Sequence, residues 1–416
     1  MSFSFAFDVP ADELDEELDL PTSQLASLNI SEQPLASGSG TAVPHKEVPL
    51  NELLETLPPL LSYTPVTVPI AATATQPVRH VLLLRRDLFD ARFQVLNQDE
   101  DGEGEDDKPK ADKGKQKEEL FIDEQTDLVK GVYEGGLKTW ECSLDLVDCL
   151  AARGFISEED LGESRVRGKS ILEVGCGTAV PTCALFARLL DEITKKPTTV
   201  DAPRPKKTRI HLQDYNKQVL TLITLPNLLL TYANHLAFPS HAPDADEDVD
   251  PTGADRQPGE LDVTPELLEA FEALLERENI ELRFFEGDWS GMDEAVRAGH
   301  RKAETEEAEK GYDLVLTSET VYSIPSLEPL LDLLEAASER VGAANEEDAA
   351  LCLVACKRIY FGVGGGELEF RRRVEARGGE VEAVWGEGEG KGKSSGVGRT
   401  VMSVRWAEKG SKAGEQ

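Results

Sequence analysis

Short apolar runs rich in β-branched residues alternate with longer amphipathic stretches from Leu128 onward. The amphipathic stretches have the length that a helical crossover between parallel strands needs. The expected strands are Ser170–Val174, Arg209–Gln213, Glu281–Phe285, Asp313–Thr317, Leu351–Cys356, Val381–Trp385 and Val401–Arg405. The pattern predicts an α/β domain with a doubly wound, seven-stranded and mostly parallel sheet. A glycine-rich segment without helical pattern joins the last two strands, so we expect a hairpin and one antiparallel strand at that edge.

Charge and composition divide the rest of the chain. Residues 1–45 contain no Lys or Arg, and this predicts a disordered acidic arm over 1–48. An N-terminal extension over 49–127 is expected to hold a helix broken at Pro58, paired strands within 78–96 and a disordered charged loop at 97–120. The main domain is expected over 128–408 with an acidic insert at 238–263, followed by a disordered tail at 409–416.

The net charge excludes some partners and favours others. With 44 basic and 79 acidic residues the chain carries −35, which argues against direct nucleic-acid binding and suits a basic protein partner. The six cysteines form no CxxC pair, so a reduced intracellular protein without a zinc site is expected. No secretory signal is apparent, and the uncharged stretch 218–243 is interrupted by Pro226 and Asn227. We therefore expect a buried helix there and no membrane association.

The end of the first predicted strand carries the first candidate chemistry. Ser170–Val174 leads into Gly175 and Gly177, and a helical pattern follows. Glycines allow a sharp turn and close approach of a ligand, although an ordinary turn would look the same. Glu173 lies two residues before the first glycine, and a phosphate-binding site would avoid an acid beside the turn. The acid favours a cationic ligand such as S-adenosylmethionine over a dinucleotide.

The next two strand ends suit a nucleoside. Asp214 follows the second strand, where a carboxylate can accept hydrogen bonds from both ribose hydroxyls. Gly287, Asp288 and Trp289 follow the third strand and offer an acid for an adenine amino group and an apolar plane beside its ring. Trp289 alone would equally fit a core or rim aromatic residue.

Several motifs occurring in order resemble one family. They are YEGGLKTWEC from Tyr133, LEVGCGTAVP from Leu172, LQDYN from Leu212, TLPN from Thr224, GDW from Gly287, LTSETVY from Leu316 and KRIYFGVGGG from Lys357. The chain from about Val78 to Trp385, and the opening MSFSF, resemble the histidine protein methyltransferase 1 family, seven-strand S-adenosylmethionine-dependent enzymes that modify a ribosomal protein. Two departures are Glu173, where many relatives have Asp, and Ala179, where many have Gly.

The resemblance implies S-adenosylmethionine as cofactor and assigns roles to residues. The implied cofactor-binding residues are Lys138, Thr139, Trp140, Glu141, Cys142, Glu173, Gly175, Gly177, Gln213, Asp214, Tyr215, Gly287, Asp288, Trp289 and Ser318. Trp140 could instead be a core aromatic residue. Glu319 and Tyr322 are the implied substrate-facing, catalytic pair and would share a face on a helical turn; a capping role for Glu319 at the start of the following helix stays open. The glycines from Gly364 to Gly366 favour a flexible substrate-contacting loop over a plain turn.

The expected reaction is methyl transfer to a histidine imidazole nitrogen, the tele nitrogen by family resemblance, of a large-subunit ribosomal protein. An imidazole with pKa about 6.5 is mostly neutral at pH 7 and needs no strong base, so Glu319 need only fix its tautomer. A monomer in the cytoplasm and nucleus, with no metal, is expected. Two alternatives stay open: a lysine methyltransferase of the same fold, and a non-catalytic scaffold that binds a ribosomal protein.

Overall fold

A computed structural model describes eleven parts of the chain. They are residues 43–71, 79–91, 94, 136–156, 164–199, 203–237, 257–303, 311–340, 349–360, 364–386 and 398–406. All belong to one compact unit, residues 43–106 with 136–416. The predicted arm up to residue 42, the charged loop 97–120, most of the acidic insert and the tail 409–416 lie outside the described residues.

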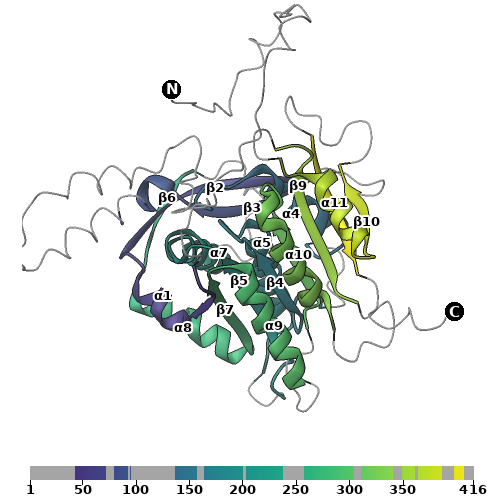
Figure 1. Cartoon of the computed structure of the whole chain (residues 1–416). Helices are drawn as coiled ribbons and strands as arrows, with labels where there is room; N and C mark the ends of the chain where they lie inside the picture. The colour runs from purple at the N-terminus through teal and green to yellow at the C-terminus, as the bar shows by residue number, and fades with distance from the viewer. Residues whose placement is uncertain are drawn as a thin grey trace, which may run out of the picture. The chain divides into compact units, whose positions relative to one another are not determined.

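The central element is an eight-stranded, mostly parallel sheet (Figure 1). Its strands, in spatial order, are β1 Lys46–Val48, β7 Ile280–Glu286, β5 Thr208–Asp214, β4 Ser170–Val174, β8 Leu314–Ser318, β9 Leu351–Lys357, β11 Arg399–Arg405 and β10 Glu380–Trp385. The seven strands expected from sequence are confirmed, each within two residues of its predicted ends. The α/β class and the doubly wound, mostly parallel sheet are therefore as predicted.

Two details of the sheet differ from expectation. The antiparallel strand β11 is not at the edge, because it inserts between β9 and β10 and pairs antiparallel with both. An eighth strand, β1, pairs antiparallel with β7 and lies within the segment predicted as a disordered arm. Without β1, β7 would be an edge strand with unpaired backbone N–H and C=O groups. These groups can pair with a neighbouring segment even when that segment has a weak β-strand propensity of its own.

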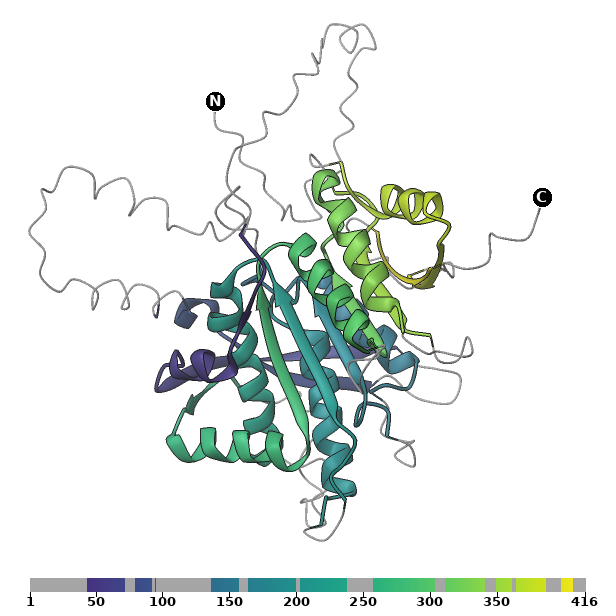
Figure 2. The same ribbon diagram turned by 60° about the horizontal axis from the view of Figure 1, so that its bottom comes forward.

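Helices cover both faces of the sheet (Figures 1 and 2). α4 Glu141–Ala152, α5 Val180–Lys195 and α7 Leu225–Ala237 pack together on one face, while α9 Trp289–Ala303 and α10 Ile324–Ser338 pack together on the other. Successive residues of β4 alternate between these layers, Ile171 in the first core cluster and Leu172 in the second, as the two-residue period of a strand requires. Further helices are α1 Leu50–Glu55, α8 Pro265–Arg277 and α11 Glu367–Ala376.

A second, three-stranded sheet is built from the N-terminal extension. β2 Leu60–Ile70 pairs antiparallel with β3 Arg79–Arg86 and with β6 Gly259–Asp262. The expected helix before Pro58 is confirmed in part as α1, but residues 60–63 begin β2 and are not helical. The prediction of paired strands within 78–96 was wrong for the residues that the structure describes there, because β3 is the one strand among them and it pairs with β2 instead. β6 comes from the predicted acidic insert and is ordered by its pairing with β2.

The described part of the uncharged stretch, up to Ala237, forms one continuous helical segment made of α6 Lys217–Val219, the π-helical turn η3 Leu220–Thr224 and α7. Within the described residues, Lys217–Ala237 is long and apolar enough to cross a membrane, but 72% of its most apolar window is buried inside the protein. This burial is typical of a core helix and agrees with the expectation from sequence.

Candidate active site

The turn after β4 has the strained backbone that its glycines predict. Gly175 and Gly177 have φ of 62° and 50°, and Ala179 adopts the same left-handed region at 51° directly before α5. A Cβ at Gly175 would come within 2.5 Å of the Thr320 side chain, and one at Gly177 within 3.2 Å of the Gly136 carbonyl oxygen. The turn is therefore closely covered by two other segments, and larger residues do not fit at Gly175.

Gln213 and Asp214 tie the neighbouring strand ends to this turn. The Gly177 N–H donates to Asp214 Oδ2 at 2.9 Å, and the Gly175 N–H donates to Gln213 Oε1 at 3.2 Å. Gln213 is fully buried and also donates to the Gly287 carbonyl at 2.8 Å. The predicted glycines, ribose carboxylate and third strand end thus meet at one point, as the carboxyl ends of parallel strands should.

Glu173 is placed differently from the interpretation that an acid faces the ligand. Its side chain is 1% exposed and accepts hydrogen bonds from the Thr182 hydroxyl and, at 3.1 Å, the Thr182 N–H in the first turn of α5. Burial raises its pKa to about 8, although the hydrogen bonds from Thr182 oppose the rise. The carboxyl group therefore stabilises the start of α5 and is neutral at pH 7, so it offers no direct counter-charge to a cationic ligand.

The segment before β1, which includes Val43 and Pro44, covers the predicted adenine side of the site. No pattern in the sequence predicted this contact. The Val43 N–H donates to the Tyr215 hydroxyl at 3.1 Å, and the Val43 carbonyl accepts from the Asp288 N–H at 2.9 Å. A Cβ at Gly287 would lie 2.4 Å from the Pro44 carbonyl oxygen. Trp289 donates from Nε1 to Gln213 Oε1 at 3.0 Å and packs against the second core cluster. The segment before β1 therefore fixes the loop after β7.

The segment before α4 lies across the opposite side of the glycine turn. Thr139 and Thr178 join their hydroxyl groups at 3.2 Å. Trp140 precedes α4, and the ammonium groups of Lys138 and Lys357 lie over its ring, 5.1 and 4.9 Å from the centroid. Cys142 is fully buried, and burial raises the pKa of its thiol well above the ordinary value. Trp140 is therefore a partly polar platform and not a residue of the apolar core.

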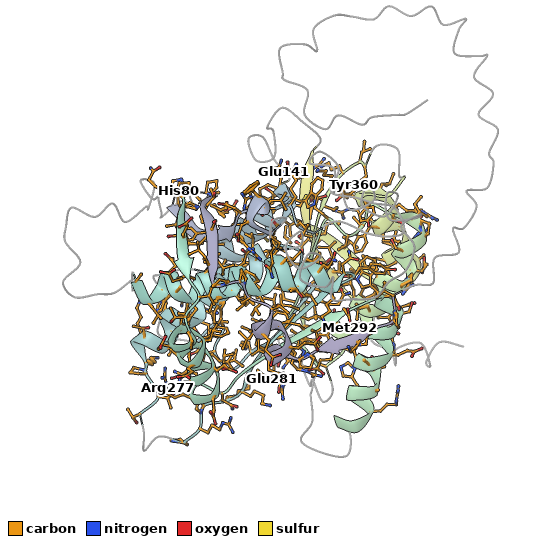
Figure 3. All side chains as sticks on the ribbon, turned by 90° about the vertical axis from the view of Figure 1, so that its left-hand side faces the viewer. His80, Glu141, Arg277, Glu281, Met292 and Tyr360 are labelled. Atoms are coloured by element: carbon orange, nitrogen blue, oxygen red, sulfur yellow. The ribbon has the colours of Figure 1, made fainter. Side chains whose placement is uncertain are left out.

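Glu319 lies at the centre of a polar cluster that the sequence did not reveal. It follows β8 and holds a left-handed backbone with φ of 57°, which is costly for a residue with a Cβ. The Tyr360 hydroxyl donates to Glu319 Oε2 at 2.5 Å, and the Lys357 ammonium lies 3.8 Å from Oε1. Lys357 also lies 3.4 Å from Glu141 Oε2. Figure 3 shows Glu141 and Tyr360 at the same end of the molecule.

Two expectations about this region change. Glu319 does not cap α10, which begins at Ile324 after Ser323, and it shares no helical face with Tyr322. The two residues meet instead through Tyr360, whose ring packs edge-on against Tyr322 at 6.3 Å between centroids. Lys357 and Tyr360 belong to the motif KRIYFGVGGG, which was the only sign of them in the sequence.

The glycine run is packed and does not form an open loop. The Gly365 N–H donates to the Tyr322 carbonyl at 3.1 Å, and a Cβ on Gly365 would lie 2.3 Å from that oxygen. Gly364 forms an isolated bridge with Ser323. Close backbone approach therefore explains the glycines better than flexibility does.

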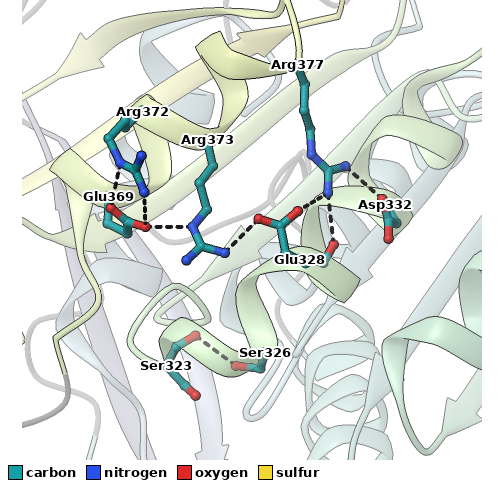
Figure 4. A network of polar contacts seen from close by, with 8 residues as sticks. All are labelled: Ser323, Ser326, Glu328, Asp332, Glu369, Arg372, Arg373 and Arg377. Carbon is teal, nitrogen blue, oxygen red and sulfur yellow. Dashed lines mark hydrogen bonds and ion pairs between the residues drawn. The ribbon is translucent and has the colours of Figure 1, made fainter. Parts of the chain in front are cut away.

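Ion pairs hold α11 against α10 beside this bridge (Figure 4). Arg377 of α11 contacts Glu328, and its Nη1 lies 2.7 Å from Asp332 Oδ1. Arg373 bridges Glu369 of its own helix, at 2.7 Å, and Glu328 of α10, at 2.6 Å. The network holds together the two helices that flank the glycine run and so helps to position Gly364–Gly366 beside Tyr322.

A cavity of about 500 Å³ has none of the predicted site residues in its lining. It is bounded by α9 and by the β5 and β7 side of the sheet, with His45, His211 and Arg283 in its lining. In Figure 3, Met292 of this cavity lies far from Glu141 and Tyr360. The candidate active site is therefore defined by the convergence of strand ends and not by this hollow.

Comparisons with known proteins place the chain in a family. No family model matches it. Histidine protein methyltransferase 1 of Schizosaccharomyces pombe is 33% identical over 348 residues, which cover 83% of this chain and 82% of the relative. The Saccharomyces cerevisiae protein of the same name is 32% identical, with coverage of 72% and 70%. The chain belongs to the histidine protein methyltransferase 1 family.

Solved structures add little to this assignment. An S-adenosylmethionine-dependent methyltransferase from Clostridium acetobutylicum matches with 9% identity and a TM-score of 0.29, over 64% of this chain and 92% of that one. A ribosomal protein L11 methylase from Lactobacillus delbrueckii matches with 10% identity and a TM-score of 0.28, over 66% and 84%. Such low scores carry no weight for the function.

As a histidine protein methyltransferase 1 family member, the protein is an S-adenosylmethionine-dependent protein-histidine methyltransferase with a class I fold. Its residues suit this cofactor. Asp214 offers a carboxylate at the ribose position, and Gly175 and Gly177 leave the turn without side chains. Glu319 Oε1 is a buried acceptor with no hydrogen bond among the described residues. The cofactor supplies an electrophilic methyl group, while the protein binds, orients and desolvates the reactants.

Proposed function

We propose that the protein methylates the tele nitrogen of a histidine side chain in a large-subunit ribosomal protein. The observation that supports this most directly is the buried, unsatisfied Oε1 of Glu319. Its other oxygen, Oε2, is already held by the Tyr360 hydroxyl at 2.5 Å. A single carboxylate oxygen is thus left to accept one N–H group from an incoming substrate.

An imidazole suits this acceptor. If its Nδ1–H donates to Glu319 Oε1, the proton is fixed on that nitrogen and the lone pair of Nε2 points away, toward the methyl donor. The carboxylate need not remove a proton before attack, since an imidazole with pKa about 6.5 is mostly neutral at pH 7. The strained backbone of Glu319 holds the oxygen in place before the substrate arrives.

The charge of the protein supports a basic substrate. A net charge of −35 attracts Lys- and Arg-rich proteins such as those of the ribosome and speeds their encounter. We propose on the same ground that the enzyme works as a monomer, without direct nucleic-acid or membrane contact, in the cytoplasm and nucleus where ribosomal proteins are made and assembled.

The test is transfer of labelled methyl groups to purified large-subunit ribosomal proteins, followed by a panel in which single histidines are replaced. The expected result is label on one protein, lost with one replacement, and tele-methylhistidine in the mass spectrum and by chromatography against both isomers. Label on a lysine would support the rival lysine methyltransferase instead. Absence of cofactor binding by calorimetry would support a non-catalytic scaffold.

Glu319→Gln separates the tautomer role from general damage. Gln keeps the size and an acceptor oxygen but lacks the negative charge. Its N–H₂ group can also donate to the imidazole, which would stabilise the tautomer with the proton on the other ring nitrogen. The expected result is a fall in kcat of about tenfold or more with unchanged cofactor affinity, since one charge-assisted hydrogen bond contributes about 1.5–3 kcal/mol. Unchanged kcat would refute the proposed role of Glu319.

A further inference from the structure

The Lys357 ammonium lies in surroundings that resemble a receptor for a substrate ammonium. It lies 4.9 Å from the centroid of the Trp140 ring, 3.4 Å from Glu141 Oε2 and 3.8 Å from Glu319 Oε1. An aromatic face combined with carboxylates is the arrangement by which proteins bind alkylammonium groups. The Lys357 side chain is 19% exposed, so most of it is buried within the cluster.

Lys357 and its three partners come from three different parts of the fold. Trp140 and Glu141 stand at the start of α4, Glu319 follows β8, and Lys357 ends β9. The Lys357 N–H also donates to the Tyr360 hydroxyl at 3.2 Å, so the backbone at Lys357 is fixed to the residue that holds Glu319. Such convergence on one ammonium is not needed for folding, because long flexible lysines are normally solvated.

We propose that Lys357 fills, from within the protein, the place that a substrate lysine would occupy, and thereby restricts the acceptor to a neutral imidazole. This inference rests on the proposed function. With Lys357 present, a lysine ammonium entering the site meets a fixed positive charge that lies 3.4 Å from Glu141 Oε2 and 3.8 Å from Glu319 Oε1. A neutral imidazole meets no such repulsion and can still bond to the free oxygen of Glu319.

The charges around Lys357 are consistent with this role. The charged and titratable groups that face the cluster are Lys138, Glu141, Cys142, Asp145, Glu319, Tyr360 and Arg399. Arg399 and Asp145 neutralise each other, at 2.6 Å. Removing Lys357 therefore leaves Glu141 and Glu319 as two carboxylates beside an aromatic ring without the cation between them.

The first experiment measures binding and needs no methyl transfer. Lys357→Ala and wild-type protein without cofactor are titrated by calorimetry with n-propylammonium, which replaces the three carbons and the nitrogen that the variant lacks. The neutral isostere n-propanol and sodium chloride are the controls. The expected result is that n-propylammonium binds the variant at least about tenfold more tightly than it binds wild type, while n-propanol binds neither.

The second experiment measures selectivity with matched peptides. Peptides with Lys or with uncharged norleucine at the acceptor position are titrated against wild type, Lys357→Ala, Lys357→Met and Lys357→Arg, and the ratio of the two affinities gives the preference for Lys. The preference for Lys over norleucine is expected to rise about tenfold in the Ala and Met variants and to stay low in the Arg variant. Lys138→Met is the matched control: it removes the other cation near Trp140 but leaves Lys357 in place, so no gain is expected.

Activity provides a third readout. Methylation of the Lys peptide should rise in Lys357→Ala and fall again when n-propylammonium, but not n-propanol, is added, because the added ammonium refills the place that Lys357 left. If the variant is folded by circular dichroism yet shows neither n-propylammonium binding nor a gain in lysine preference, the inference is overturned. A wild-type protein that fails to methylate histidine would refute the proposed function alone, because the binding experiment would still decide the role of Lys357.

Discussion

Replacing Glu173 by Gln tests whether a fully buried carboxyl group is neutral in the folded protein. Its pKa is raised from the ordinary value of 4.5 to about 8, first by burial. Between these values the folded state keeps a proton that the unfolded state releases, so the stability of the wild type falls as pH rises from about 4.5 to 8. The difference corresponds to a ceiling of about 5 kcal/mol, from about 1.4 kcal/mol per pH unit.

Gln cannot ionise and keeps an acceptor oxygen for the Thr182 hydroxyl and N–H. Urea unfolding at pH 5 is therefore expected to show similar stability for the two proteins, and at pH 8.5 the variant should be more stable by a few kcal/mol. Glu192→Gln is the matched control, because Glu192 is also buried but is paired with Arg188 at 3.1 Å. That variant should be destabilised at both pH values.

A constant stability difference between wild type and Glu173→Gln from pH 5 to 8.5 would refute this reasoning. So would a carboxylate band and no carboxylic acid band for labelled Glu173 in the infrared spectrum at pH 7. Either result would return Glu173 to the role of a charged group beside the glycine turn.

Two further predictions concern the turn and the helix network. Gly175→Ala should lower S-adenosylmethionine affinity by about tenfold or more in calorimetry, because its Cβ would lie 2.5 Å from the Thr320 side chain. Gly154→Ala is the control and should keep wild-type affinity, because Gly154 also has a positive φ but has open space around the Cβ position. Arg377→Ala should destabilise the protein by about 1–2 kcal/mol in urea unfolding, since it contacts several carboxylates of α10, whereas Arg372→Ala removes one exposed pair and should cost under about 0.5 kcal/mol. Equal losses of cofactor affinity in the two glycine variants would contradict the proposed role of the turn, and equal losses of stability in the two arginine variants would contradict the proposed role of the network.

The order of the strands and the meeting of the glycine turn with Asp214 follow from local sequence patterns. Apolar β-branched runs such as Ser170–Val174 have no good alternative to a buried strand, and the predicted ends agree with the structure. Because parallel strands end at one edge, glycines after the first strand and an acid after the second had to meet, and Gly177 bonds to Asp214 at 2.9 Å.

Only the tertiary structure decided the edges of the sheet and the acceptor side of the site. β1 and β6 come from polar or acidic segments whose own propensity is weak, and each is ordered by the unpaired backbone of a neighbouring strand. The sequence suggested that Glu173 faces a cationic ligand, but its contact with α5 encloses the carboxyl group and burial raises its pKa to about 8.

The cluster around Lys357 shows why the rest could not be predicted. Glu141, Glu319 and Lys357 are separated by long stretches of sequence, and no spacing rule relates them. They meet because the crossovers of the sheet return the chain repeatedly to one edge, where side-chain packing then selects the contacts. Local pattern fixes where strands end, whereas the identity of the groups that touch there depends on how the whole chain packs.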